Sequence, residues 1–524
     1  MPQMDGGIGS GGAGWRDRVV VIGAGMGGLA AAIDLARRGA EVTVLERAAT
    51  AGGKMRQVQA GSADVDAGPT VFTMRWIFEA LFADAGERLE DQLDLMAADI
   101  LARHAWRPGD KAGGRLDLFA DVGRSAEAIG DFAGAAEARG YRDLVARSAD
   151  IHRTLVGSFI AAERPSPLAL VNRVGWGQLD ALWRTTPWRT MWSALGQHFR
   201  DGRLRQLFGR YATYCGCSPF LAPATLMLVA HVEQDGVWLV RGGMVRVAEA
   251  LQGLAERQGA RFRFGAHVAE ILVENGRTAG VRLADGERLL ADAVVFNGDV
   301  AALARGFLGK KVRNAAADTP DAARSLSAVT WCARVPTSGF PLTHHNVFFA
   351  DDYAEEFDAV FRRRTICQAP TVYICAQDRG SGDPPEGSAE RLLLLINAPP
   401  DGDQRDFGAE LPHLARRTIR LLQDCGLELD LPQEATTPTT PTGFDALFPA
   451  SGGALYGRAS HGTMGTFARA GGVTRLSGLY CAGGSVHPGP GIPMAVMSGR
   501  LAAARLLEDR AGKVRRAVRL PVPA

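Results

Sequence analysis

Residues 18–47 read RVVVIGAGMGGLAAAIDLARRGAEVTVLER, and this stretch decides the fold. Its apolar run at 19–22 is typical of a strand that is buried on both faces of a parallel sheet. Three glycines follow in G-x-G-x-x-G spacing, namely Gly23, Gly25 and Gly28. The alanine-rich residues 29–38 then predict a helix that ends at Gly39, and residues 41–45 predict a second strand.

This order of strand, glycine turn, helix and strand has a chemical reason at each step. The first glycine permits a tight turn, the second lets the backbone approach a pyrophosphate, and the third lets the helix pack closely on the strand. The helix N-terminus offers unpaired N–H groups and the positive end of its dipole to phosphates. Glu46 ends the second strand, where an acidic side chain hydrogen-bonds a ribose diol. The stretch therefore predicts a dinucleotide-binding unit.

The composition favours a large protein without a global affinity for nucleic acid. The chain has 524 residues, of which 46% are hydrophobic, and this is enough for two domains with separate cores. A formal net charge of +2 provides no overall attraction to a polyanion. Seven cysteines without a C-x-x-C pair favour a reduced setting over a disulfide framework. We interpret Cys215 and Cys217 as ordinary thiols, and we expect no metal site.

No segment predicts a membrane-spanning helix. The first 17 residues are glycine-rich and lack an apolar core, so we interpret them as a loose tail and not as a signal peptide. The best apolar candidate, residues 220–232, contains Pro223 and is shorter than the ~18 residues that a spanning helix needs. We expect a protein that is soluble or lies on a membrane surface.

Two glycine-containing segments extend the predicted nucleotide site. AGGKMRQV (51–58) predicts a loop that carries Gly53, Lys54 and Arg56 near the phosphates. DAGPTVF (66–72) predicts a turn that enters another strand. Either segment alone is equally typical of a surface loop, but their position after the dinucleotide unit favours cofactor binding.

The rest of the chain predicts two interleaved domains. Residues 76–236 show helical periodicity, whereas a helix, several strands and two hairpin turns return after residue 237. A short strand at 479–482, the loop GGSVHPGPGIP and a helix at 494–509 follow near the end. We divide the chain into a flexible tail (1–17), a nucleotide-binding domain (18–75, 237–303 and 441–510), a substrate and membrane-contact domain (76–236 and 304–440) and a second tail (511–524).

A segment rich in tryptophan and arginine lies inside the second domain. Residues 173–192 interleave three arginines with four of the nine tryptophans of the chain: Arg173, Trp176, Trp183, Arg184, Trp188, Arg189 and Trp192. This combination favours a membrane interface, where an amphipathic ring lies at headgroup depth. The alternative is a helical core with arginines on its surface.

Over residues 18–509 the chain resembles the FAD-dependent carotenoid desaturases, the bacterial phytoene desaturase family. The motifs that carry the resemblance are VVVIGAGMGGLAAA with Glu46, GGKMR, DAGPTVF, VWLVRGGM, FNGDV and HPGPGIP. It implies an α/β fold with a Rossmann-like FAD-binding domain, of the amine-oxidase and phytoene-desaturase type, and an interleaved α+β substrate domain. Within the family, DAGPTVFTM (66–74) and LFGRYATYCGCSP (207–219) are most similar to the hydroxyneurosporene, or methoxyneurosporene, desaturases of purple phototrophic bacteria.

The resemblance also implies roles for single residues. Glu46 holds the adenosine ribose, Val268 contacts adenine through its main chain, and Lys54 and Arg56 lie near the phosphates or the flavin edge. The implied FAD-binding residues are Gly23, Gly25, Gly28, Glu46, Gly53, Lys54, Arg56, Val268, Gly484, Gly491, Ile492 and Met494. His487 is the candidate catalytic residue, and its alternative role is to orient the loop by hydrogen bonds.

The implied activity is the introduction of a C3–C4 double bond into acyclic 1-hydroxycarotenoids by hydride transfer to the flavin, in carotenoid biosynthesis of the spheroidene or spirilloxanthin type. The implied partners are a hydroxylated carotenoid, a membrane lipid surface, and oxygen or a quinone as electron acceptor; nucleic acid is not expected. The implied location is cytoplasmic, peripheral on the inner or an intracytoplasmic membrane. The alternatives are a multi-step phytoene desaturase, a flavin amine oxidase and a non-catalytic carotenoid-binding flavoprotein.

Overall fold

A five-stranded parallel sheet lies at the centre of one half of the molecule. The structure is a computed structural model that describes residues 17–108, 113–175, 177, 179–380, 382, 384 and 387–517. The strand order is β19-β13-β1-β2-β9. The strands are β1 (Arg18–Ile22), β2 (Glu41–Leu45), β9 (Arg261–Arg263), β13 (Ala293–Phe296) and β19 (Leu479–Cys481). All four contacts between them are parallel, which confirms the predicted strand–helix–strand unit.

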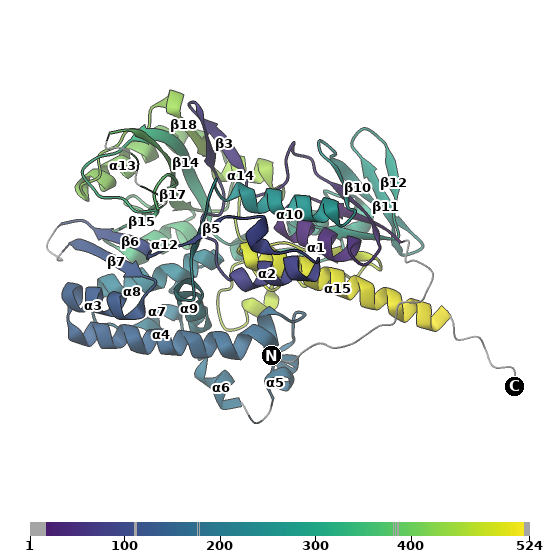
Figure 1. The fold of residues 1–524 in the computed structure, drawn as a ribbon, viewed down its shortest axis with the longest axis horizontal. Coiled ribbons are helices and arrows are strands. Elements are labelled where there is room, and N and C mark those ends of the chain that lie inside the picture. The colour runs from purple at the N-terminus through teal and green to yellow at the C-terminus, as the bar shows by residue number, and fades with distance from the viewer. Residues whose placement is uncertain are drawn as a thin grey trace, which may run out of the picture.

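Helices cover one face of this sheet. α1 (Met26–Ala36) is buried along its whole length, because its small side chains let neighbouring elements approach closely. Three helices pack with it in one core: α2 (Arg75–Asp84), α10 (Val245–Arg257) and α15 (Ile492–Ala517). Figure 1 shows α1, α10 and α15 stacked beside one another. Val19 and Val21 of β1 face this core, whereas Val20 and Ile22 face a second one.

The second core lies under a three-stranded antiparallel sheet. Its strands are β10 (Val268–Glu274), β11 (Arg277–Leu283) and β12 (Arg288–Leu290). Asn275 and Gly276 both have positive φ between β10 and β11, as a tight hairpin turn requires. Both hairpins lie where the sequence predicts them.

A seven-stranded mixed sheet forms the other half. Its order is β18-β14-β17-β16-β15-β6-β7. The strands are β6 (Ile100–Trp106), β7 (Gly114–Phe119), β14 (Ser327–Pro336), β15 (His345–Phe349), β16 (Val372–Ala376), β17 (Ala389–Ala398) and β18 (Thr436–Thr439). β6 and β7 come from a region in which helical periodicity dominates the sequence, and neither strand is predicted there. They join the sheet because β6 pairs in parallel with β15, far away in the chain.

A layer of helices lies against this sheet, below it in Figure 1. It is built from α3 (Val122–Ala133), α4 (Ala135–Leu155), the π-helical turn η2 (Val156–Ile160), α5 (Pro167–Val174), α6 (Leu179–Arg184), α7 (Met191–Leu195), α8 (Gly202–Gly209), η4 (Arg210–Cys215), η5 (Ala224–Met227) and α9 (Leu228–Gln234). α5 and α6 lie at the lower edge of the molecule in that view. The predicted helical character of this region is confirmed.

The remaining strands and helices connect these layers. They are β3 (Gln57–Ala60), β4 (Ala63–Asp66), β5 (Leu95–Ala97), β8 (Trp238–Val240), α11 (Val300–Ala304), α12 (Tyr353–Asp358), the π-helical turn η8 (Ala359–Arg363), α13 (Leu411–Asp424) and α14 (Pro441–Leu447). Short 3-10 turns lie at η1 (Leu89–Asp91), η6 (Lys310–Val312), η7 (Asp321–Ala323), η9 (Gly408–Glu410), η10 (Gln433–Ala435) and η11 (Thr466–Ala468).

Three sequence predictions need correction. The strand expected after the turn at residues 66–69 is absent: residues 70–74 are irregular and lead into α2, with one bridge from Phe72 to Trp238. The helix predicted to begin at residue 29 begins at Met26, because the glycine turn is its first turn. α2, placed with the substrate domain, packs in the core of the parallel sheet through Ile77 and Phe78.

Two predictions on cysteines and on membrane spans can be compared with the fold. All seven cysteines are free thiols, with Cys215 half-buried and Cys217 buried. Across the described ranges, no helix combines the length and the apolar character that crossing a bilayer requires. Residues 220–232 instead contribute η5 and α9, whose inner sides line the cavity described next.

Candidate functional site

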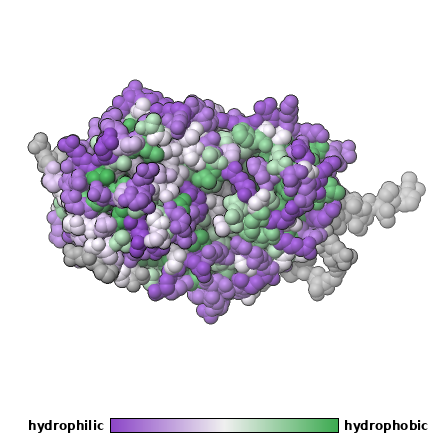
Figure 2. Space-filling model, turned by 90° about the horizontal axis from the view of Figure 1, so that it is seen from above, coloured by the Kyte–Doolittle hydropathy of each residue, from purple (hydrophilic) through white to green (hydrophobic). Residues whose placement is uncertain are grey.

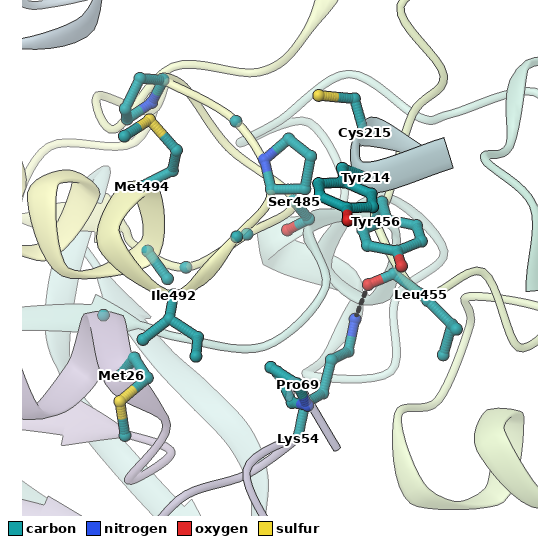
Figure 3. Close-up of a pocket in the computed structure, with 18 of the residues that line it drawn as sticks. Met26, Lys54, Pro69, Tyr214, Cys215, Leu455, Tyr456, Ser485, Ile492 and Met494 are labelled. Carbon is teal, nitrogen blue, oxygen red and sulfur yellow. Dashed lines mark hydrogen bonds between the residues drawn. The ribbon is translucent and has the colours of Figure 1, made fainter. Parts of the chain in front are cut away.

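One cavity of about 910 Å³ joins the two halves of the molecule. Its wall begins at the glycine turn after β1 and at Glu46, passes the loop before α15, and continues to α5 and α6. Figure 3 shows part of its lining, including Met26, Lys54, Ile492 and Met494. A cavity of this size, mostly apolar and with a few polar groups, is typical of a cofactor or ligand site.

The glycine turn has the close contacts that its spacing predicts. Gly23 has a φ of +96°. A Cβ at Gly28 would lie 2.1 Å from the carbonyl oxygen of Gly23, so this glycine permits the contact between helix and strand. Gly23 and Gly25 line the cavity, whereas Gly28 lies behind them. The backbone of the turn is therefore open to a ligand on one side and tightly packed on the other.

Glu46 lies at the carboxyl end of β2 beside the glycine turn. It is 8% exposed, and its Oε2 accepts a hydrogen bond of 2.7 Å from the backbone N–H of Ala24. Its Oε1 accepts one of 2.8 Å from the N–H of Ala48. Val268 lines the same end of the cavity. A fixed carboxylate at this place is suited to the hydroxyl groups of a ribose.

Two helix N-termini point at the cavity from opposite ends of the chain. Gly25 and Met26 at the start of α1 line it, and so do Gly491 and Ile492 at the start of α15. Asn297, which follows β13, lies between them: its Nδ2 donates to the carbonyl of Gly23 at 3.1 Å. Two aligned helix dipoles favour negative charge in the space that they share.

Two cations, the half-buried Lys54 and the buried Arg469, add to this positive potential. Lys54 lines the cavity, and its Nζ donates to the carbonyl of Leu455 (Figure 3). Burial lowers the pKa of Lys54, and Asp299 opposes that shift. Arg469 also lines the cavity and is 2% exposed, and burial lowers its pKa. Within the part of the chain that the structure describes, neither side chain forms a salt bridge with a carboxylate.

Arg469 holds the loop that precedes α15. Its Nη1 donates to the carbonyls of Tyr456 and Gly484, each at 2.9 Å, and its Nη2 donates to the carbonyl of Arg458. Gly484 lines the cavity, as do Gly491, Ile492 and Met494. The loop is therefore fixed from behind by a buried guanidinium group.

The remaining predicted residues of this loop, one glycine and one cation, lie nearby. Gly53 lines the cavity with a φ of +61°, and a Cβ there would lie 3.3 Å from the Cα of Gly25. Arg56 lines it too and donates to Oγ1 of Thr439 at 3.2 Å. The loop at residues 51–58 thus lies beside the glycine turn in space, as its sequence predicts.

His487 faces away from the cavity. Its Nε2 lies 2.9 Å from the carbonyl oxygens of both Phe159 and Ala162, and it donates to them across the two halves of the chain. Its Nδ1 is buried and has no partner among the described residues. Burial lowers the pKa of His487 to about 4, so the ring is neutral at pH 7. These contacts favour the alternative role, in which the imidazole orients the loop.

The tryptophan group divides into two sets. Trp183 and Trp188 are 70% and 46% exposed, and their ring centroids lie 4.2 Å apart. Trp192 packs against the core of the helical layer, with the guanidinium of Arg205 4.5 Å from its ring centroid. The predicted interfacial role therefore does not extend to Trp192, and Trp176 lies outside the described residues.

Three potential metal ligands lie close together at the pair of β15 and β16 in the seven-stranded sheet. Ligand atoms of His344, His345 and Cys375 lie within 4.8 Å of one another. Hydrogen bonds already fix both rings: Nδ1 of His344 contacts the carbonyl of Arg379 at 2.8 Å, and Nδ1 of His345 contacts the hydroxyl of Tyr373 at 2.8 Å. The sequence prediction of no metal site did not anticipate this cluster.

Taken together, these residues fit an anionic dinucleotide that lies across the carboxyl ends of β1 and β2. Sequence reasoning identified the glycine turn, Glu46 and the loop before α15, but it missed Asn297 and Arg469 as contributors. Asn297 had a usable signal, because it directly follows a buried strand of the parallel sheet. Arg469 had no usable signal in the sequence, where it is a single arginine in the glycine-containing run ARAGG.

Comparisons with known proteins agree with this geometry. The family model described as flavin containing amine oxidoreductase matches residues 26–507. The chain is 53% identical to a hydroxyneurosporene desaturase of Rubrivivax gelatinosus, over 96% of this chain and 95% of that protein. It is 44% identical to a hydroxyneurosporene desaturase of Cereibacter sphaeroides, over 95% and 99%. A 1-hydroxycarotenoid 3,4-desaturase of Flavobacterium sp. is 29% identical, over 93% and 98%.

Solved structures show the same fold at low identity. Putrescine oxidase bound to putrescine gives a TM-score of 0.56 at 14% identity, over 95% of this chain and 100% of that one. Cyclohexylamine oxidase from Brevibacterium oxydans gives 0.52 at 17% identity, over 94% and 99%. These similarities establish the fold of the chain, whereas its chemistry has to be inferred from the residues of the site.

Proposed function

The chain belongs to the flavin containing amine oxidoreductase family and, within it, to the carotenoid desaturases, and on that premise we propose that it introduces the C3–C4 double bond of acyclic 1-hydroxycarotenoids. It is an FAD-dependent oxidoreductase. Two relatives above 40% identity are named hydroxyneurosporene desaturases. Another relative, at 29% identity, is named for 3,4-desaturation. These names support the finer assignment of substrate and bond.

The residues present fit FAD. The glycine turn leaves no room for a Cβ at Gly28, and the carboxylate of Glu46 is fixed beside it. We assign Glu46 to the ribose and Val268 to the adenine. The phosphates then face the start of α1 and the loop that carries Lys54 and Arg56. The flavin end faces Gly484, Gly491, Ile492 and Met494, which line the cavity before and in the first turn of α15.

The observation that carries the proposal is the continuity of the cavity. The cavity that fits FAD is also lined by Tyr214 and Tyr456 and by apolar residues of α4, η2, α5 and α6. Leu155, Phe159, Leu170 and Leu182 are part of this wall. A long hydrocarbon can lie there with one end beside the flavin position, whereas a small polar amine would leave most of the wall unused.

The protein contributes position and electrostatics to the reaction. FAD, held by the residues named above, would supply the acceptor for a hydride from one carbon of the substrate, and the second hydrogen would leave as a proton. The apolar wall holds the chosen bond in place and excludes water. The N-termini of α1 and α15, with Lys54 and Arg469, stabilise negative charge at the cofactor. His487 holds the loop before α15 through Phe159 and Ala162, and its predicted catalytic role is the less favoured one.

We further propose that the substrate is taken from a bilayer and that oxygen or a quinone removes the electrons. Trp183 and Trp188 are exposed on the same short segment whose inner side lines the cavity at Leu182 and Pro187. The face seen from above in Figure 2, on the side away from α5 and α6, shows hydrophilic residues around its edge and hydrophobic residues in parts of its middle. This arrangement supports a peripheral location on the inner or an intracytoplasmic membrane, with α5 and α6 towards the lipid.

A product assay tests the proposal. FAD-loaded protein in liposomes receives 1-hydroxyneurosporene or, separately, phytoene, and absorbance and chromatography follow the product. We expect loss of two hydrogens and a red shift from the hydroxylated substrate only. Successive red shifts from phytoene would replace this proposal with a multi-step phytoene desaturase. No change with either substrate, despite bound flavin, would contradict a desaturase role altogether.

A further inference from the structure

A polar cluster is buried in the otherwise apolar half of the cavity. Arg210, Tyr214 and Glu233 all line the cavity, and Arg210 and Glu233 are 7% and 3% exposed. Nη2 of Arg210 donates to the hydroxyl of Tyr214 at 2.8 Å, and that hydroxyl donates to Oε2 of Glu233 at 2.8 Å. The hydroxyl of Tyr211 donates to Oε1 of Glu233 at 2.9 Å. A cation and a carboxylate are thus joined through one tyrosine.

Such a cluster is costly in a binding site for a pure hydrocarbon. Removing a guanidinium and a carboxylate from water costs several kcal/mol for each ion. Contacts with a hydrocarbon do not compensate for this desolvation, because a hydrocarbon has no polar groups. Burial raises the pKa of Glu233, which reflects that cost, while Arg210 and the two tyrosines oppose the shift. Nε of Arg210 and the hydroxyl of Tyr353, which stands beside the cluster, are buried without a partner among the described residues. The cluster therefore retains hydrogen-bonding capacity that the protein does not use.

The cluster lies close to the loop that faces the flavin position. Tyr214 belongs to η4, and the next residues run along the segment that carries Tyr456: a Cβ at Gly216 would lie 2.6 Å from the ring of Tyr456. That segment in turn contacts the loop, since a Cβ at Gly457 would lie 2.9 Å from the Cα of Ser485. Figure 3 shows Tyr214 and Tyr456 beside Ser485.

We infer that Arg210, Tyr214 and Glu233 form the receptor for the hydroxyl group at the end of the carotenoid substrate. A hydroxyl both donates and accepts, so it can accept an N–H of Arg210 or donate to Glu233 or to the oxygen of Tyr214. The inference rests on the proposed function and deepens it. In a 1-hydroxycarotenoid the hydroxyl is on C1 and the reacting bond joins C3 and C4, so both lie at the same end of the chain. A receptor next to the flavin position therefore selects the end and sets the bond that is oxidised.

The orientation of the substrate follows from this placement. With the hydroxyl held at Glu233, the polyene extends along α9 and η5, whose inner residues from Glu233 back to Thr225 line the cavity. The eight residue steps from Glu233 to Thr225 span roughly 12 Å at the rise of an α-helix. Beyond them the wall continues to α5 and α6, towards the exposed tryptophans. The hydroxylated end is thus the innermost part of the bound substrate.

The test compares two carotenoids of equal length, 1-hydroxyneurosporene and neurosporene. The variants are Tyr214→Phe, Glu233→Gln and Arg210→Lys, and the control is Tyr141→Phe. Tyr141 is also buried, and its hydroxyl donates to Gln234 outside the cavity wall. Binding of each carotenoid to the FAD-loaded protein is measured by quenching of the protein's intrinsic fluorescence. The value of kcat/KM is measured with the hydroxylated substrate. Flavin content and Tm identify any variant that does not fold.

We expect each folded cluster variant to lose about tenfold or more in affinity and kcat/KM for the hydroxylated carotenoid, with neurosporene binding unchanged within about twofold. The Tyr141→Phe control keeps the ratio of the two affinities. A variant that weakens the binding of both carotenoids equally, or of neither, overturns the inference. In that case, desaturation by the wild-type protein still supports the proposed function. If the wild-type protein binds both carotenoids without desaturating either, the proposed function fails, and the affinity ratios still decide the role of the cluster.

Discussion

His487 shows how a residue in a functional loop acts through its hydrogen bonds. Its Nε2–H joins the loop before α15 to the carbonyls of Phe159, within the π-helical turn η2, and of Ala162, just after that turn. A further proton would have to enter at Nδ1, which is buried without a partner and lies near the cations Arg164 and Arg469. The folded protein therefore resists protonation of this ring.

The first prediction concerns the pH dependence of stability. The pKa of His487 is about 4 in the folded protein and about 6.5 in an unfolded chain, so between these values the unfolded chain binds the extra proton. Its contribution to the free energy of unfolding is present above about pH 6.5 and is lost as the pH falls towards 4. His487→Phe removes the titrating group, and we expect a flatter fall in stability over this window, measured by chemical denaturation at pH 7, 5.5 and 4.5.

The same variant separates positioning from acid–base catalysis. A positioning residue predicts a lower stability at pH 7, because two carbonyls lose their donor, with kcat reduced by less than about tenfold. A general acid or base contributes on the order of 10² to 10⁴ in rate, so a loss of that size in folded, flavin-loaded His487→Phe would restore the catalytic role. Single-turnover flavin reduction by the hydroxylated carotenoid is the measurement.

At the scale of elements, the crossing of α1 and α15 brings the two ends of the chain to one cofactor site. Gly499 of α15 faces the first turn of α1: a Cβ there would lie 2.0 Å from the carbonyl oxygen of Gly27. Gly27 itself has no room on its other side, since its own Cβ would lie 2.6 Å from the backbone nitrogen of Gly483. The helices, the glycine turn and the C-terminal loop are therefore in backbone contact.

The second prediction is that Gly499→Ala destabilises the cofactor site. The methyl group forces the helices apart, and overpacking of this kind costs about 2 kcal/mol, so we expect a lower Tm and a lower flavin content after purification. Gly512→Ala on the same helix is the matched control, because a Cβ there meets nothing within 4 Å. Alanine favours a helix over glycine, so the control keeps or raises Tm. Equal behaviour of the two variants would contradict the role given to the crossing.

The elements that the sequence predicts are those with local signals. The unit from β1 to Glu46, the hairpins of β10 to β12 and the start of α15 each have turn residues and periodicity within a short window. β6 could not be found in this way, because its place in the sheet depends on pairing with β15 more than 200 residues away, and β7 joins the sheet only through β6. The cluster of Arg210, Tyr214 and Glu233 has the same limitation, since only packing of η4 against α9 brings its members together.

At the scale of the molecule, one cavity connects a nucleotide-binding sheet to a surface segment with exposed apolar side chains. The parallel sheet fixes the cofactor end, the seven-stranded sheet and the helical layer enclose the substrate section, and α5 and α6 close the far end (Figure 1). Leu170 and Leu182 of these helices face the cavity, whereas Leu168 and Trp183 are 62% and 70% exposed. The same short segment thus has an apolar inner side and an apolar outer side, as an access route for a water-insoluble substrate requires.

The last prediction tests this arrangement. The double variant Trp183→Ser/Trp188→Ser removes two exposed rings that contribute about 1 kcal/mol each when they enter the interface, so liposome partitioning should fall by about tenfold or more. Trp76→Ser is the control, because Trp76 is also exposed but lies on α2, away from α5 and α6. Turnover should fall when the carotenoid is supplied in liposomes and persist when it is supplied in detergent micelles, because the internal site is intact. Unchanged co-sedimentation with liposomes would assign the exposed rings to another partner, and an equal loss of turnover in micelles would mean that they shape the cavity itself.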